Sequence, residues 1–294
     1  MNRLLAPVVA CAVALASAPP ALAQEAQADW DLLRDPAKRL TMAYSQFDSG
    51  VGIAARCVDE SYEALITGLP PAGSGETRIL QVAFGDGELH PQRWNVAVED
   101  TIAVSELPAP FARKLREGGR LRIMIPGAAE GGRNLMHDLT LPASSSSIDE
   151  TLTVCDRPLT DPRDADLEAL PDGGLPANLA WARRPRPRFP TPARYARGFA
   201  TVMCLTNPDG SLRDCSVEAE HPQDAGFGEE ALRATRRARV ANLDAAGAAV
   251  PLQRILYRTN FVLEGYQTRD DEQRRREQRD RDREIRERQR TAGD

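Results

Sequence analysis

Apolar and polar positions divide the chain into two parts with folding patterns, which are separated and followed by segments rich in proline or charge. Between residues 30 and 156, short apolar runs alternate with turn residues at regular spacing. Runs of this length, bounded by Gly, Pro or Asp, predict β-strands. The predicted strands cover 51–57, 62–67, 77–84, 93–98, 121–125 and 139–141.

Two short helices are expected beside these strands. The segment 110–116 reads PFARKLR and is followed by Gly118-Gly119, a pattern typical of a helix end. The segment 147–154, which reads SIDETLTV, has helical spacing just before Cys155. For 30–156 we therefore predict a small β-sandwich-like domain with two minor helices.

The second patterned part, residues 191–266, mixes both periods. Apolar residues alternate on either side of Asn207-Pro208-Asp209-Gly210, a strong turn signal, so a hairpin is expected. The expected elements are a helical turn at 193–197, strands at 200–206 and 212–217, a helix at 227–240 and a final strand at 252–263. The predicted order is helix-β-β-helix-β, and the predicted fold class of the whole chain is α+β.

The first 23 residues have the pattern of a secretory signal peptide. A charged start at Arg3 precedes an apolar run, and Ala21-Leu22-Ala23 forms a cleavage signal before Gln24. The apolar run of about 15 residues is shorter than the roughly 20 that a membrane-spanning helix needs. We therefore expect export to the periplasm and cleavage, with an uncleaved anchor as the alternative.

Two further segments differ in composition from the predicted domains. Residues 157–190 form a Pro/Arg-rich linker, and residues 267–294 are almost wholly charged, so we expect disorder or a fraying helix there. The run 183–197 contains six arginines and no acid. It is either a solvated linker surface or a contact for anionic lipid headgroups or an acidic partner.

Charge and motif content exclude several classes of function. The formal net charge is −5, which argues against a nucleic-acid partner. The chain has no second apolar run of membrane-spanning length, which argues against a multi-span membrane protein. Ser144–Ser147 lies near His137 and Asp138 in sequence, but this spacing is no catalytic motif. With His90 and His221 also scattered, we predict no catalytic, metal or cofactor-binding residues and no cofactor.

The cysteines suggest disulfide bonds. Cleavage would remove Cys11 and leave an even number, Cys57, Cys155, Cys204 and Cys215, in an exported chain. A two-residue Asp-Gly loop would place Cys204 directly opposite Cys215 in the predicted hairpin, within bonding distance. Cys57 would then pair with Cys155. The alternative is that one or both pairs remain reduced core thiols.

Residues 188–264 resemble the C-terminal domain of the TonB energy-transducer family. The entry F-P-x-x-A-x-x-x-x-G corresponds to Phe189–Gly198, and V-x-C-x-x-x-P-D-G-x-L-x-D corresponds to Val202–Asp214. The helix F-x-x-x-A-L-R-A-x-R-R-A-R is Phe227–Arg239, and the closing G-x-x-V-P…T-x-F-V-L is Gly247–Leu263. The first part weakly resembles periplasmic domains of the invasion-associated locus B type, through Cys57, Cys155 and the segment 110–119.

The TonB resemblance implies binding of an extended segment of an outer-membrane transporter by strand addition. The strand residues it implicates are Leu252, Arg254, Leu256, Arg258, Asn260 and Val262, which could also serve packing alone. Since a cleaved leader and a folded domain replace the anchor and spacer of a transducer, we expect a periplasmic binding or scaffold protein, not an enzyme. Its expected partner is an envelope protein, with peripheral membrane contact at most; homodimerisation stays open. The alternatives are an anchored transducer and an envelope hydrolase.

Overall fold

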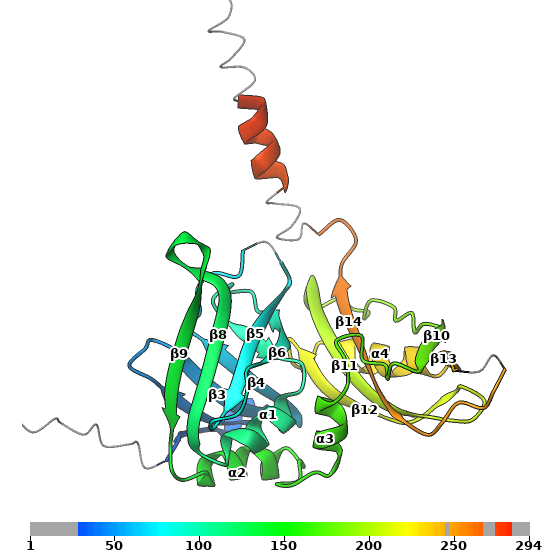
Figure 1. The fold of residues 1–294 in the computed structure, drawn as a ribbon, viewed down its shortest axis with the longest axis horizontal. Coiled ribbons are helices and arrows are strands. Elements are labelled where there is room, and N and C mark those ends of the chain that lie inside the picture. The colour runs from blue at the N-terminus through cyan, green and yellow to red at the C-terminus, as the bar shows by residue number, and fades with distance from the viewer. Residues whose placement is uncertain (1–28, 74, 245–246, 267–273, 284–294) are drawn as a thin grey trace, which may run out of the picture.

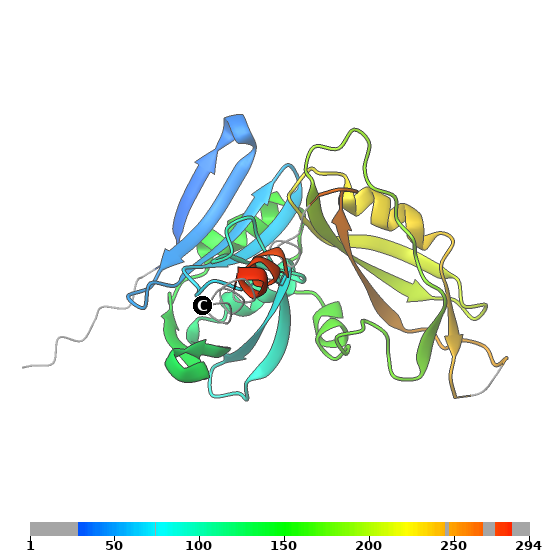
Figure 2. The same cartoon turned by 90° about the horizontal axis from the view of Figure 1, so that it is seen from above.

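The computed structural model describes residues 29–73, 75–244, 247–266 and 274–283, which form two β-sheet units side by side (Figures 1 and 2). The predicted signal peptide and most of the charged tail lie outside the described residues. Residues 274–283 are helical and exposed. Within the described ranges, no helix has the length and apolar character needed to cross a membrane.

The first unit is a single antiparallel sheet of nine strands, in the order β1-β2-β3-β4-β7-β6-β5-β8-β9. Its helices are α1 (Pro108–Leu115) and α2 (Ser146–Val154). The strands are β1 Asp31–Asp35, β2 Leu40–Gln46, β3 Gly52–Val58, β4 Ser61–Thr67, β5 Thr77–Phe84, β6 His90–Val96, β7 Ala103–Ser105, β8 Gly119–Ala129 and β9 Arg133–Leu141.

Alternation along these strands builds the core of the first unit. Tyr62, Ala64 and Ile66 of β4 are all buried, because side chains two residues apart point to the same face of a strand. Helix α1 packs on β4 and β7, and α2 packs on β2 and β3. Their apolar residues, such as Phe111 and Ile148, complete the same core.

The predicted α+β class and the β-sandwich are wrong. Strands are the main secondary structure of the described chain, with 42% of its residues against 20% in helices. Among the described residues, all nine strands of the first unit belong to one curved sheet, and α1 and α2 complete its core near the lower end of the sheet in Figure 1. Strands β1, β2 and β7, which the sequence patterns did not mark, supply the extra width.

The second unit has a three-stranded antiparallel sheet in the order β12-β11-β14. Its members are β11 (Arg197–Thr206), β12 (Leu212–His221) and β14 (Arg254–Val262). Helix α4 (Phe227–Thr235) packs on β11 and β12. Strand β10 (Leu179–Arg183) pairs separately with β13 (Arg239–Asn242).

The main-chain N–H groups at the start of α4 are capped by a residue of a neighbouring strand. The residue before it, Gly226, carries no capping side chain. The Glu220 carboxylate on β12 instead accepts hydrogen bonds from the main-chain N–H groups of Ala225, Phe227 and Gly228, at 2.9–3.1 Å. Burial raises the pKa of Glu220, while these N–H groups act against the rise.

Two predicted helical segments of the second unit are corrected. Residues 193–197 form bends and the start of β11 rather than a helical turn, since Pro190 and Pro192 interrupt the preceding chain. Helix α4 stops at Thr235 instead of 240, because Arg239–Asn242 extends to pair with β10. The observed order in the sheet and its helix is therefore β-β-α-β.

The segment expected to be a linker, 157–190, contains regular structure and lies against both units. Helix α3 (Arg163–Glu168) contacts β14, and β10 pairs with β13. Buried Arg113 of α1 donates to both Asp164 oxygens at 2.5 and 2.7 Å and to the Pro158 carbonyl at 3.0 Å. This segment is therefore held on the first unit as well as on the second.

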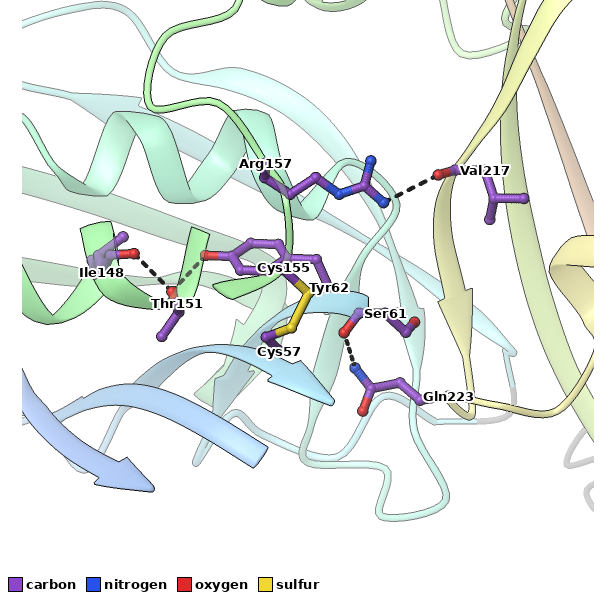
Figure 3. The surroundings of a disulfide bond; sticks show 9 residues. All are labelled: Cys57, Ser61, Tyr62, Ile148, Thr151, Cys155, Arg157, Val217 and Gln223. Atoms are coloured by element: carbon purple, nitrogen blue, oxygen red, sulfur yellow. Dashed lines mark hydrogen bonds between the residues drawn. A yellow bond between two sulfur atoms is a disulfide. The ribbon is translucent and has the colours of Figure 1, made fainter. Parts of the chain in front are cut away.

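Both disulfide bonds join the cysteines paired in the sequence analysis. Cys57 bonds Cys155 with a Cα–Cα distance of 5.5 Å, and Cys204 bonds Cys215 at 4.1 Å. Figure 3 shows the first bond beside the junction of the units, where Arg157 donates to the Val217 carbonyl and Gln223 to the Ser61 carbonyl. The pairs indicate an oxidising compartment, periplasmic or extracellular.

The hairpin register that led to the second pair was not correct in detail. Thr206 pairs with Leu212, so the loop is longer than two residues, and Asn207 N–H donates to the Ser211 carbonyl at 2.8 Å. The register then shifts between Met203 and Leu205. Asp214, with a positive φ of 48°, lies opposite this shift and brings Cys215 alongside Cys204.

A candidate binding groove at the edge of the second sheet

The second sheet is covered on both faces. Alternate residues of β11, such as Ala200 and Val202, contact α4 within one apolar cluster. Phe199, on the opposite face of β11, packs with Leu65 and Val104 of the first unit. Met203 and Leu256 pack against Leu167 of α3. The first unit therefore serves as the second layer of this sheet.

Two buried carboxylates of the first unit, Glu63 and Glu106, contact the second unit at the same junction. The Glu63 carboxylate on β4 accepts from Arg56 at 2.5 Å and contacts the His221 Nδ1 of β12 at 2.7 Å. Glu106 lies 2.5 Å from Arg258 of β14 and 3.1 Å from Arg93 of β6. Each carboxylate is paired by both units, as a buried charge requires.

One edge of the second sheet is formed by β14. Thr206 N–H donates to the Gln253 carbonyl at 3.0 Å and Leu263 N–H to the Ala196 carbonyl at 2.8 Å. These two bonds show which residues of β14 are hydrogen-bonded to β11. Odd-numbered residues direct their main-chain N–H and C=O groups to β11, and even-numbered residues direct theirs outward. The outward residues are Arg254, Leu256, Arg258, Asn260 and Val262.

The first half of this edge is occupied by the segment that follows α3. Leu256 N–H donates to the Gly174 carbonyl at 2.7 Å, and Arg254 donates to Asp166 at 2.8 Å. Gly174 has a φ of +71°, and a Cβ there would lie 2.1 Å from the Leu256 carbonyl oxygen. Only glycine allows so close an approach.

The second half of the edge is open. Within the described residues, the outward main-chain groups of Arg258, Asn260 and Val262 have no hydrogen-bond partner. A hollow of about 180 Å³ lies beside Leu256–Asn260, between β14, the first sheet and residues 172–184. We call this open edge and the hollows beside it the edge groove.

A larger cavity of about 590 Å³ continues from that hollow toward α1, and both share Arg93, Glu106, Asp172 and Arg258. Its apolar lining includes three aromatic rings, with Phe111 edge-on to Trp94 at 5.0 Å and to Phe84 at 5.8 Å. Lys114 lies over the Phe84 ring and pairs with Glu168 of α3 at 2.8 Å. The cavity thus joins an aromatic wall to a charged rim.

The residues implicated by the TonB resemblance divide into three groups in the structure. Leu252 precedes β14 and is exposed. Arg254, Leu256 and Arg258 already make contacts within the chain, and Asn260 and Val262 lie at the open end. The sequence analysis missed Trp94, Phe111 and Glu106, since no motif links the first domain to β14. Whether the strand binds a partner stays a prediction.

The histidines do not form the catalytic arrangement that a hydrolase would need. His90 pairs with Val82, Val82 with Ile123, and Ile123 with His137, so three strand spacings of about 4.8 Å separate the histidines. Asp138 binds Arg120, and Ser147 donates to the Trp30 carbonyl. Among the described residues, no cluster of His, Cys, Asp or Glu has the arrangement to hold a metal ion.

Comparison with known proteins identifies a partial likeness and no family. No family model matches the chain, and no curated protein matches it. The solution NMR structure of the TonB C-terminal domain from Pseudomonas aeruginosa matches with a TM-score of 0.27 and 20% identity, covering 31% of this chain and 92% of that chain. We build no functional argument on a likeness of this size.

Proposed function

We propose that this chain is an exported periplasmic binding protein that takes an extended polypeptide segment into the edge groove. The open main-chain edge from Arg258 to Val262 is the observation that carries the proposal. Unpaired N–H and C=O groups of an edge strand attract a further strand, because each main-chain group gains a hydrogen bond there. A segment entering here would pair, antiparallel or parallel, with the outward main-chain groups of Arg258, Asn260 and Val262 at the end of β14.

The cavity next to the edge determines which segment would fit. The aromatic wall of Phe84, Trp94 and Phe111 suits an apolar side chain, which pocket-lining rings recognise in many binding sites. We therefore expect the bound segment to carry an apolar residue that enters this cavity.

The partner we propose is an envelope protein with an exposed extended segment. An outer-membrane transporter fits this description, and it is the partner that the TonB-like sequence motifs of residues 188–264 imply. Two disulfide bonds support an oxidising compartment, and the signal-like residues 1–23 support export into the periplasm. N-terminal sequencing of the exported chain should begin at Gln24; a chain that retains Met1 would favour the anchored alternative.

A proline substitution tests strand addition at the groove. Asn260→Pro removes an outward N–H while leaving the ladder with β11 intact, since edge strands tolerate proline at such positions. Twelve-residue peptides selected by display on the wild-type chain should bind Asn260→Pro at least about tenfold more weakly, the cost of a lost and blocked hydrogen bond. Asn260→Ala should bind like wild type. Equal binding to all three proteins would contradict the proposal.

A further inference from the structure

A second surface, away from the edge groove, gathers arginines from two separate parts of the chain. Helix α4 lies on the face of the second sheet opposite to the first unit (Figure 2). A hollow of about 750 Å³ runs between the end of α4 and the segment 183–188. We call it the arginine groove. Its lining arginines are Arg183, Arg184, Arg186, Arg188, Arg233, Arg236 and Arg237.

The positive charge of the arginine groove is not balanced by acidic side chains in the part of the protein that the structure describes. The only acid in its lining is Glu230, which pairs with Arg233. Among the described residues, the other six arginines make no ion pair, although the chain as a whole has 43 acidic residues against 38 basic ones. Elsewhere in the molecule exposed arginines such as Arg34, Arg39 and Arg120 have acidic partners.

Such clustering is unfavourable without a counter-charge, because like charges in one hollow repel each other. The fold nevertheless assembles it: one set of arginines lies on α4 and in the turn between α4 and β13, and the other lies on β10 and in the chain after it, and β10 pairs with β13. A guanidinium group presents planar, paired donors that match the oxygens of a phosphate. The groove therefore suits a surface that carries several phosphates.

We infer that the arginine groove binds the phosphate groups of anionic phospholipid at a membrane surface. A protein partner is less well matched, because protein interfaces have apolar or aromatic anchors at their centre, and only Pro187 and Ala234 line this groove beside the charged residues. Headgroup binding needs no such anchor and grows with the number of basic side chains near the surface. Bound in this way, the protein would remain peripheral and keep the edge groove free for its partner.

Vesicle sedimentation tests the inference with a matched control. The chain beginning at Gln24 is mixed with vesicles of phosphatidylcholine, with or without about one-third phosphatidylglycerol. Arg186→Gln/Arg236→Gln/Arg237→Gln neutralises three exposed groove arginines whose side chains make no hydrogen bond or ion pair with the described residues. The control variant Arg275→Gln/Arg276→Gln/Arg279→Gln removes the same charge from the exposed tail helix. Both variants are first checked by circular dichroism, and exposed positions should leave the fold unchanged.

Wild type and the tail variant should bind the anionic vesicles, lose binding at high salt and ignore the neutral ones. The groove variant should bind the anionic vesicles at least about tenfold more weakly. Equal losses in the two variants would show an effect of net charge alone and overturn the inference. Binding of polyglutamate through the groove without vesicle binding would assign it to an acidic protein partner and would also overturn it.

Discussion

At the residue scale, a small network of charges between α1, α3 and β12 ties the segment 157–190 to both units. Asp161 lies 2.7 Å from Arg163 and 3.6 Å from Arg113, and Arg163 continues to Glu218 at 3.1 Å. The Asp161 carboxylate is almost wholly buried. Its hydrogen bond with Arg163 lowers the pKa of Asp161 below its ordinary value of 3.8.

This lowered pKa gives a testable dependence on pH. A carboxyl whose pKa falls on folding stabilises the protein above its unfolded pKa, and that contribution is lost as the pH falls toward the folded value. Asp161→Asn should reduce the free energy of unfolding at pH 7 by about 1.5–3 kcal/mol, the worth of charged hydrogen bonds. Urea denaturation should show this difference shrinking below about pH 4.

The control for Asp161→Asn is Asp138→Asn. Asp138 also binds an arginine, Arg120, and that hydrogen bond lowers its pKa as well, but the pair is exposed on β8 and β9. Exposed pairs contribute little because water screens them. The description of the network would be contradicted if Asp138→Asn and Asp161→Asn reduced the free energy of unfolding equally. It would also be contradicted if the reduction in Asp161→Asn did not depend on pH.

At the element scale, the loop around Gly174 determines how much of β14 is open. Gly174→Ala places a Cβ against the Leu256 carbonyl and demands a left-handed conformation from alanine. The loop should therefore withdraw, and the Leu256 N–H should exchange with deuterium faster, by about tenfold or more. Gly131→Ala, with the same sign of φ but open space, is the control; unchanged exchange at Leu256 would refute this role of the loop.

How far the elements were predictable depends on where their hydrogen bonds come from. Strands β3, β4 and β5 were located as short apolar runs bounded by turn residues, since each carries its own buried side chains. Residues 239–242 instead continue the apolar spacing of α4 and become a strand only because β10 pairs with them. The short strand β7 is likewise defined by its two neighbours, β4 and β6. Such pairings join distant residues and leave no local signal.

At the scale of the whole molecule, the junction between the units makes them depend on each other. Phe199 is 4% exposed and packs on Leu65 and Val104 of the first unit. Phe199→Ala should lower the free energy of unfolding by about 3–5 kcal/mol, because it removes packing at the junction. Calorimetry should show a single thermal transition for wild type and two for the variant, with the second unit melting first.

The control lies inside one unit. Phe111→Ala opens the core of the first unit and should lower one common transition without splitting it. Two transitions in the wild type would show that the units unfold independently.

The edge groove depends on the same junction, and for this reason the sequence indicated the strand β14 but not the Trp94 wall or Glu106 that complete the groove.

The order of the disulfide bonds has a consequence for biogenesis. Cys57 pairs with Cys155 and Cys204 with Cys215, so the two covalent loops follow each other along the chain and do not interleave. In a chain threaded through a membrane from its N-terminus, the first pair is complete before Cys204 emerges. For a chain exported as proposed above, oxidation in order of appearance gives the native pairs, so we expect refolding with an oxidant alone to restore both bonds without an isomerase.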